Sequence, residues 1–142
     1  MQTGLMCFEI VSKINQTDVD IRKILKEYAV GDSELPKEEL VRIIKQSDFK
    51  VKIKNIPPEE IEGKYPLPAI MIQKDGTYSV VLKTNTKDKK ALIFTPSEKQ
   101  PKEFSFEEIT ELCNNEFIIL SPKMLNAQIK FGFAWFFAEI MT

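Results

Sequence analysis

One absence limits the chemistry of this 142-residue chain: it contains no histidine. Cys–His and Ser–His catalysis both use an imidazole as base, and zinc sites built on two thiols almost always include a histidine. The two thiols, Cys7 and Cys113, would also need a cationic neighbour or a base to lower their pKa from about 8.5. The residue types therefore indicate neither cysteine peptidase chemistry nor a metal site, and two isolated cysteines are typical of reduced thiols in a cytosolic compartment.

Other patterns that bind ligands are sparse. The sequence has no Gly-x-x-x-x-Gly-Lys and no Gly-x-Gly-x-x-Gly motif, so no recognisable nucleotide site is predicted. A net charge of −1 argues against a nucleic-acid partner, because such modules normally carry a basic excess. Glu107, Glu108 and Glu111 fall on the outer face of a predicted helix, where a solvated surface explains them better than a metal or acid–base cluster.

Alternating lysines form the clearest surface pattern. The stretch Phe49-Lys50-Val51-Lys52-Ile53-Lys54 alternates apolar and basic residues, which predicts a strand with one apolar face and one lysine face. Two interpretations remain open. Lysines can keep an exposed strand soluble and unpaired, or the basic stripe can meet an acidic partner.

The predicted elements are helices first and strands later. Apolar residues spaced for one helix face predict helices at residues 4–14, 21–28 and, after Pro36, around residues 40–44. Gly31 is predicted to end the second of these helices. Further on, Ser105 and Glu108 form a capping box at the start of another helix.

Strands between Pro66 and Pro96 organise the second half of the chain. Three apolar runs, at residues 69–72, 78–82 and 91–94, predict three consecutive antiparallel strands, with Asp75-Gly76 as the first hairpin turn. The first run is continuously apolar, which is typical of a strand buried on both faces. Residues 117–120 form the last predicted strand. Helices followed by antiparallel strands indicate an α+β fold.

The C-terminal stretch differs in kind, because five aromatic residues fall within residues 131–137. It is too short to cross a bilayer, which needs about 20 apolar residues. Aromatic rings beside Lys130 suit a membrane interface, and packing onto the domain's own sheet is equally open. We expect residues 1–122 to form the domain and residues 123–142 to be an aromatic linker that leads toward a first transmembrane helix. The membrane-proximal residues would be Phe131, Phe133, Trp135 and Phe136.

Several motifs carry a family resemblance. The opening, Gln2 to Val11, resembles the Asp-Cys-Gly-Leu-Ala-Cys-Leu-x-Met-Val start of the double-glycine leader peptidase domains that precede bacteriocin-processing ABC exporters. Residues 67–70, 75–76 and 92–96 resemble the central stretch of those domains. The chain is most similar to the peptidase-like domain of haemolysin-type (RTX) exporters, whose Phe-x-Phe-x-Trp-Phe segment is reproduced at residues 131–136. The resemblance spans residues 3–137 and implies a papain-like cysteine-peptidase fold, with N-terminal helices packed on a curved antiparallel sheet.

The sequence departs from that family at its catalytic positions. Thr3 stands where the nucleophilic cysteine belongs, Tyr78 where the histidine belongs, and Thr95 where the aspartate belongs. The resemblance therefore implies a degenerate domain that has no catalytic residues and is not an enzyme. We expect these three residues to cluster where the helix and strand ends meet, with either threonine bonding the Tyr78 hydroxyl.

The function implied by the resemblance is a non-catalytic domain of a bacterial type I secretion ABC exporter, on the cytoplasmic side of the inner membrane. It would engage the unfolded RTX-type polypeptide for export, with Tyr78, Lys50, Lys52 and Lys54 as candidate substrate-binding residues. A structural or regulatory module is the alternative, and an active leader peptidase is a weaker one.

The expected partners are the unfolded secreted polypeptide, the membrane and nucleotide-binding domains of the same exporter, and the membrane interface. No nucleic acid is expected. The chain itself is expected to hold no metal and no cofactor, since ATP and Mg²⁺ would belong to the exporter's nucleotide-binding domain.

Overall fold

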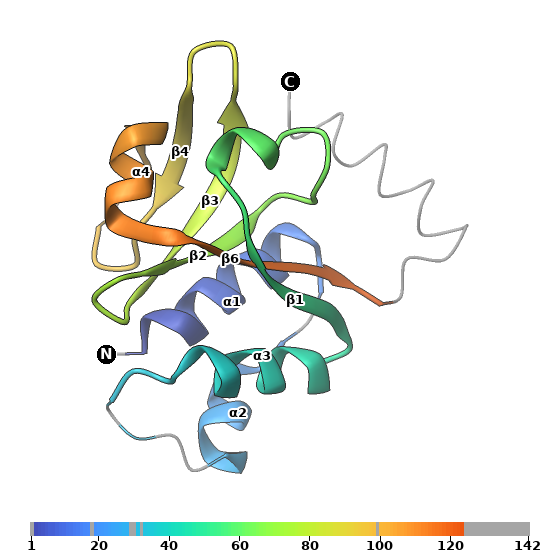
Figure 1. The fold of residues 1–142 in the computed structure, drawn as a ribbon. Helices are drawn as coiled ribbons and strands as arrows, with labels where there is room; N and C mark the ends of the chain where they lie inside the picture. The colour runs from blue at the N-terminus through green and yellow to red at the C-terminus, as the bar shows by residue number, and fades with distance from the viewer. Residues whose placement is uncertain (1, 18, 29–30, 32, 99, 124–142) are drawn as a thin grey trace.

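The computed structural model describes residues 2–17, 19–28, 31, 33–98 and 100–123 (Figure 1). The described elements are three helices, then a six-stranded antiparallel sheet with a short 3-10 helix and a fourth helix between its strands. In chain order they are α1 (Thr3–Ile14), α2 (Ile21–Glu27), α3 (Lys37–Gln46), β1 (Phe49–Asn55), η1 (Pro58–Glu60), β2 (Ala69–Gln73), β3 (Tyr78–Asn85), β4 (Lys90–Phe94), β5 (Lys102–Ser105), α4 (Phe106–Leu112) and β6 (Cys113–Pro122).

The strand order in the sheet is β1-β6-β2-β3-β4-β5. β2, β3 and β4 are neighbours joined by hairpins, which confirms the three consecutive antiparallel strands predicted from the sequence. β6, the last strand in the chain, inserts between β1 and β2, where Ile118 pairs with both Ile53 and Ile70. The N-terminal helical part of the chain is thereby joined to the sheet through β1, which lies at one edge.

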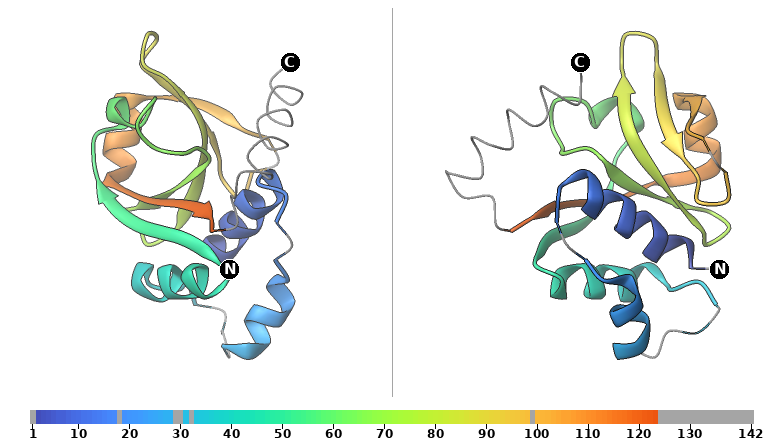
Figure 2. Two further views of the ribbon diagram at one scale, coloured as in Figure 1. Left: turned by 90° about the vertical axis from the view of Figure 1, so that its right-hand side faces the viewer. Right: turned by 180° about the vertical axis from the view of Figure 1, so that it is seen from behind.

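The apolar core is split between the two faces of the sheet. α1 and α3 cover one face, where Leu5, Phe8 and Leu40 are completely buried. The rings of Phe8 and Phe49 meet edge to face there, with centroids 5.1 Å apart. α4 and η1 cover the other face, around Phe117. Figure 2 shows α1, α2 and α3 gathered at one end of the molecule and α4 at the other.

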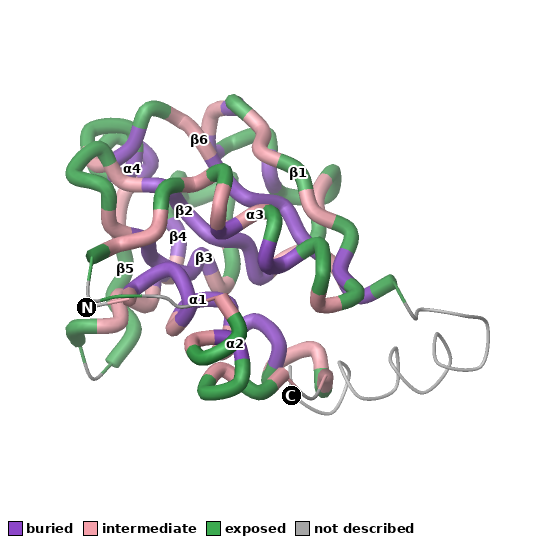
Figure 3. Tube along the Cα trace, turned by 90° about the horizontal axis from the view of Figure 1, so that it is seen from below, coloured by how far each residue is buried: buried purple, intermediate pink, exposed green. Residues whose placement is uncertain are grey.

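The second helix is more peripheral than the others. Asp20 caps α2 by accepting the backbone N–H of Lys23, and Ile24 is its one buried residue. Figure 3 shows most of α2 coloured as intermediate or exposed. The prediction that Gly31 ends this helix is wrong, because α2 already ends at Glu27. Tyr28 is its C-cap residue, and the Tyr28 hydroxyl donates to the side chain of Gln46 on α3.

Two strands differ from the sequence-based expectation. β5 was not predicted, because its exposed Lys102 and Glu103 show no apolar alternation and only the pairing with β4 makes them a strand. β6 starts at Cys113, earlier than the predicted residue 117, immediately after α4. Its polar beginning includes Asn115 with φ of 59°, a left-handed conformation that asparagine tolerates better than most residues.

Residues 124–142 lie outside the described residues, and so does the proposed aromatic linker with Phe131, Phe133, Trp135 and Phe136. The expected domain boundary at residue 122 therefore stays a prediction. Within the described part of the chain, no helix has the length and apolar character needed to span a membrane.

Candidate functional site

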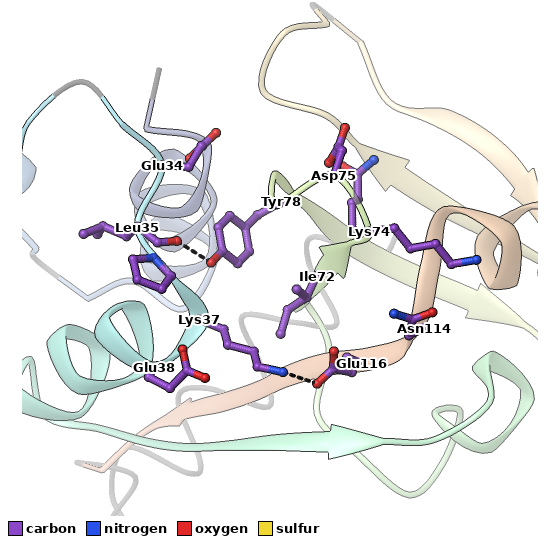
Figure 4. Close-up of a pocket in the computed structure, with 13 residues that line it drawn as sticks. Glu34, Leu35, Lys37, Glu38, Ile72, Lys74, Asp75, Tyr78, Asn114 and Glu116 are labelled. Atoms are coloured by element: carbon purple, nitrogen blue, oxygen red, sulfur yellow. Dashed lines mark hydrogen bonds and ion pairs between the residues drawn. The ribbon is translucent and has the colours of Figure 1, made fainter.

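A groove of about 440 Å³ opens between the helical part and the sheet (Figure 4). Three segments line it: the residues at the start of α3, the β2–β3 hairpin and the first residues of β6. The lining residues are Glu34, Leu35, Pro36, Lys37, Glu38, Ile72, Gln73, Lys74, Asp75, Gly76, Tyr78, Asn114 and Glu116. The groove thus carries charges of both signs on its walls, and Leu35, Pro36, Ile72 and Tyr78 are its apolar and aromatic lining residues.

Thr3, at the start of α1, is held beside this groove by three hydrogen bonds. Its backbone N–H donates to Oε1 of Glu34 at 2.9 Å, and its hydroxyl donates to Oε2 of the same carboxylate at 2.6 Å. The hydroxyl also accepts the backbone N–H of Tyr78 at 3.0 Å. Because Gln2 makes no side-chain cap, Glu34 satisfies the first turn of α1 in its place. The contact joins α1 to both the loop before α3 and the start of β3.

Tyr78 is buried, with 2% of its surface exposed. Its hydroxyl donates to the backbone oxygen of Leu35 at 2.6 Å, and burial raises its pKa to about 12, which keeps the phenol neutral near pH 7. A Cβ on Gly4 would lie 3.1 Å from the Tyr78 ring and 2.8 Å from Leu40, so this glycine lets the ring pack on α1. One expectation is corrected: the hydroxyl bonds the carbonyl of Leu35 and not a threonine.

Thr95 does not lie with Thr3 and Tyr78. Its hydroxyl lies 3.3 Å from that of Ser79, which donates to Oε1 of Gln73 at 2.7 Å. Side chains of successive residues in a strand point to opposite faces of the sheet, so Ser79 and Tyr78 face away from each other. The expected cluster of all three positions is therefore wrong: Thr3 contacts Tyr78, and Thr95 is on the other face.

An ion pair spans the groove from the start of α3 to β6. Nζ of Lys37 lies 2.6 Å from Oε2 of Glu116 (Figure 4). The hydrogen bond to Glu116 raises the pKa of Lys37 above its ordinary value. On the opposite rim, the hydroxyl and backbone N–H of Thr77 bond to Asp75 and lower the pKa of that carboxyl. The charges of the groove are thus partly committed to partners within the domain.

Neither cysteine reaches the groove. Cys7 and Cys113 are both completely buried, and burial raises the pKa of each thiol. Cys113 Sγ donates to the backbone oxygen of Ile109 at 3.1 Å. Across the described ranges, no group of three or more His, Cys, Asp or Glu side chains is placed to hold a metal ion.

The three candidate lysines lie elsewhere. Lys50, Lys52 and Lys54 line a separate groove with Tyr65 and Pro66, on the face of the sheet that carries Ile119. Tyr78 faces the α1 and α3 side. The structure therefore divides the predicted substrate-binding residues between two places.

The architecture is that of a papain-like α+β domain, with a groove beside the N-terminus of α1 and the start of β3. The chain belongs to the Peptidase C39 family, which matches residues 1–124. This confirms both the fold class and the family resemblance stated from the sequence.

Individual relatives agree with this assignment. The chain is 21% identical over 140 residues to the alpha-hemolysin translocation ATP-binding protein HlyB of Proteus vulgaris, covering 97% of this chain and 20% of that protein. It therefore spans only a fifth of the length of that relative. The N-terminal peptidase C39 like domain of the toxin secretion ATP-binding protein from Vibrio parahaemolyticus superposes with a TM-score of 0.73 at 20% identity, covering 86% of this chain and 98% of that one.

A third likeness is to a double glycine motif protease from an AMS/PCAT transporter, solved in complex with the leader peptide. It superposes with a TM-score of 0.72 at 16% identity, covering 85% of this chain and 84% of that one.

These comparisons correct one prediction. The missing histidine and the residues at the catalytic positions predicted that the chain is not an enzyme. The family is a peptidase family, and a structural neighbour is a double glycine motif protease. The absence of histidine excludes only chemistry that uses an imidazole, so it does not show that a member of a peptidase family is inactive.

Sequence reasoning missed Glu34 and Glu116, although both make short contacts at the groove. Glu34 is 31 residues from Thr3, and Glu116 is 79 residues from Lys37. No local spacing rule connects residues so far apart. The one available signal was a carboxylate just before Leu35-Pro36, where the chain must turn into a helix.

Proposed function

We propose that this domain is the N-terminal part of a bacterial type I secretion ABC exporter, on the cytoplasmic side of the inner membrane. We further propose that the groove between the helical part and the sheet, called the inter-lobe groove below, binds the exported polypeptide. The observation that carries the proposal is the position of the groove, directly beside the start of α1 and of β3. The neighbouring double glycine motif protease, which has this fold, was solved with a leader peptide. The names of the relatives, which describe toxin translocation, support the exporter. ATP and Mg²⁺ would then bind in a nucleotide-binding domain elsewhere in the full protein.

The groove has the composition that an extended polypeptide requires. Ile72 supplies an apolar wall, and the exposed Lys74 and Asn114 supply polar groups on the rim. Pockets with apolar walls and a few polar groups fix the orientation of a ligand through those groups. Gly76 leaves the hairpin side open, because a Cβ there would meet no atom within 4 Å. A backbone running along the groove would therefore find donors and acceptors without a steric barrier.

The ion pair in the groove gives the binding an electrostatic component. Lys37 and Glu116 stay partly exposed, with 35% and 22% of their side chains accessible. A carboxylate of the bound polypeptide can share Lys37 with Glu116, while Lys74 attracts a second one from the opposite rim. Binding should therefore weaken as salt concentration rises.

The test uses the full 142-residue chain. The probes are a fluorescein-labelled double-glycine leader peptide and, separately, an RTX polypeptide kept unfolded without calcium. Fluorescence anisotropy should show saturable binding to one of them, and mass spectrometry of the recovered probe reads any cleavage in the same sample. Lys74→Glu should weaken the binding about tenfold by reversing a charge on the rim. Lys87→Glu, an exposed lysine of the β3–β4 hairpin, is the matched control.

Equal effects of the two substitutions would show that the groove is not the binding site. If neither probe binds, the proposal fails, and contacts with the exporter's own membrane or nucleotide-binding domains become the better explanation for the domain. Co-purification of the chain with those domains would then be the next measurement.

A further inference from the structure

We propose that the open edge of β1 is a second binding surface, which takes up an extended acidic polypeptide segment as an additional strand. The surface consists of the outward-facing backbone groups of β1 (Phe49–Asn55) and of Lys50, Lys52 and Lys54, which are called the lysine row below. It shares no lining residue with the inter-lobe groove. The inference therefore does not depend on what that groove binds.

Hydrogen bonds just beyond the two ends of β1 show which of its residues bond to β6. β1 ends the strand order and has β6 as its one neighbour in the described sheet. Beyond one end of β1, the N–H of Ile56 donates to the oxygen of Asn115 at 2.8 Å. Beyond the other end, the N–H of Lys123 donates to the oxygen of Asp48 at 2.9 Å. In an antiparallel pair, hydrogen-bonded positions alternate with positions that make no bonds to the partner strand. Both ends require the even-numbered residues of β1 to be the bonded ones.

It follows that the backbone of the lysine row is bonded to β6. The N–H and C=O groups of Val51 and Ile53 point the other way, toward the open edge. Among the residues that the structure describes, none makes a hydrogen bond to these outward groups. The edge thus offers two donors and two acceptors to a further strand, which is the requirement for β-strand addition.

The charges of the lysine row have no carboxylate opposite them. In the register with β6, the row faces Ser121, Ile119 and Phe117. The ion pairs found among the described residues are Lys37–Glu116, Arg42–Glu39 and Lys102–Glu98, and none of them involves the row. Lysines at every second position on one face therefore form a line of uncompensated positive charge, and an acidic ligand complements it.

A groove of about 260 Å³ runs beside the row. Tyr65 and Pro66 form its other wall, and Ile119 lies within it. Ile119 is 8% exposed, so the groove has an apolar floor under charged lysine heads. Lysine stems along apolar surface with the ammonium groups in water are a common arrangement. Ile119, Leu120 and Ser121 belong to β6, so this groove lies on the β6 side of the row and not at the open edge. It supports the lysine stems and leaves the ammonium groups available to a ligand.

The spacing selects a polypeptide among acidic ligands. On an added strand, the residues opposite the row would occupy non-bonded pairs, whose Cα atoms are about 4.5 Å apart. Carboxylates at every second residue repeat about every 6.8 Å, the repeat of the row itself. A nucleic acid or an anionic lipid surface would use the lysines but would leave the open N–H and C=O groups unpaired.

The sequence also allowed the opposite role, in which edge lysines only prevent pairing. The two roles differ in what they expect of an acidic strand. Protective lysines attract it through charge alone, whatever its backbone. A docking surface requires both the charges and the backbone hydrogen bonds.

The first experiment tests the charges. The probe is a fluorescein-labelled decapeptide that alternates Glu and Val, titrated with the full chain at low salt. We expect saturable binding that weakens about tenfold in K50Q/K52Q/K54Q. The matched control, K83Q/K87Q/K90Q, removes the same charge from exposed positions at the β3–β4 hairpin and should bind as the parent does. Lys74→Glu should also leave this binding unchanged, which separates it from the inter-lobe groove.

The second experiment tests the added strand. The same decapeptide with an N-methyl group on every valine keeps its charges and loses the N–H groups that would face Val51 and Ile53, so it should not bind. In hydrogen-exchange NMR, the amides of the lysine row should be protected in the free chain. Those of Val51 and Ile53 should become protected only when the unmodified peptide is added.

Three results would overturn the inference. The first is that the N-methylated peptide binds as tightly as the unmodified one. The second is that K83Q/K87Q/K90Q weakens binding as much as K50Q/K52Q/K54Q does. The third is binding that depends on the lysine row but occurs with phosphatidylglycerol vesicles or a single-stranded oligonucleotide and not with the peptide.

Discussion

The inter-lobe groove and the β1 edge both carry charged side chains, but several of those at the groove have partners within the domain and those at the edge have none among the described residues. At the groove, Glu34 is bonded to Thr3 and Lys37 is bonded to Glu116, so the charges hold the two parts of the domain together. At the β1 edge, the lysine row has no acidic partner in the described part of the chain. A charged residue stabilises a fold where tertiary structure supplies its counter-charge, and it remains available for a ligand where it does not. The predictions below test this difference from its largest expected effect to its smallest.

Removing the Glu34 carboxylate should have the largest effect on stability. Glu34→Ala leaves the N–H and the hydroxyl of Thr3 without their acceptor, and hydrogen bonds to charged groups contribute about 1.5–3 kcal/mol. We expect the free energy of unfolding, measured by urea denaturation, to fall by about 2 kcal/mol. Glu38→Ala, an exposed carboxylate in the same groove, should change it by less than about 0.5 kcal/mol. If both variants lost a similar free energy of unfolding, Glu34 would not be a specific cap of α1.

Tyr78→Phe should cost about 1 kcal/mol, because it deletes the hydrogen bond to the Leu35 carbonyl and leaves the ring in place. The same variant has a signature at alkaline pH. The pKa of Tyr78 is raised from 10.0 to about 12 in the folded chain, so its contribution to stability is complete below pH 10.0 and is lost as the pH rises toward 12. Between these pH values the parent should lose stability more steeply than Tyr78→Phe. When tyrosinate formation is followed by ultraviolet absorbance, the parent should show a titration step with a midpoint near pH 12 that is missing from the variant. Parallel stability curves would contradict the buried, neutral phenol.

The Lys37–Glu116 pair should contribute less. The pKa of Lys37 is raised by its hydrogen bond to Glu116, so the stabilisation is present at neutral pH and is lost as the pH rises through the folded-state pKa. A double-mutant cycle with Lys37→Gln and Glu116→Gln should give a favourable coupling at pH 7, smaller than the effect of Tyr78→Phe, because both groups are partly exposed. The coupling should shrink in 1 M salt. A coupling that is independent of salt would indicate a packing effect in place of the ion pair.

Single substitutions in the lysine row should have the smallest effect on stability. Lys52→Gln removes a side chain that makes no described ion pair, and exposed surface changes of this kind stay within about 0.5 kcal/mol. Thermal unfolding of the variant should coincide with that of the parent. A clear loss of stability would mean that Lys52 has a partner within the chain, and the β1 edge would then resemble the groove.

Local patterns in the sequence predicted much of the fold. The alternation from Phe49 to Lys54 became β1, and the Asp75-Gly76 turn joins β2 and β3 as expected, with φ of 89° at the glycine. The capping box at Ser105 and Glu108 is present with both of its hydrogen bonds. These features rest on interactions between residues a few positions apart, so the order of residue types alone contains them.

The candidate sites were predictable only in part. The lysine row was visible from its period, but the groove it lines depends on Tyr65 and Ile119, which reach it from other parts of the chain. Thr3 and Tyr78 do meet, as their motif positions suggested, and Thr95 does not join them. A one-residue shift along a strand moves a side chain to the other face of the sheet, and a short sequence motif does not determine the position that accurately.

The sequence by itself determined most of the helices and strands, because helical and strand periods are properties of neighbouring residues. β5 is the exception, since only its pairing with β4 makes it a strand. The sequence also determined that β1 carries a face of alternating lysines. Only the tertiary structure decided that β6 lies between β1 and β2, that its phase turns Val51 and Ile53 toward an open edge, and that Glu34 caps α1 across 31 residues. The physical reason is that strand insertion, hydrogen-bond phase and ion pairing depend on which distant segments the core brings together. Which segments come together depends on the packing of the whole chain and cannot be read from any single stretch of it.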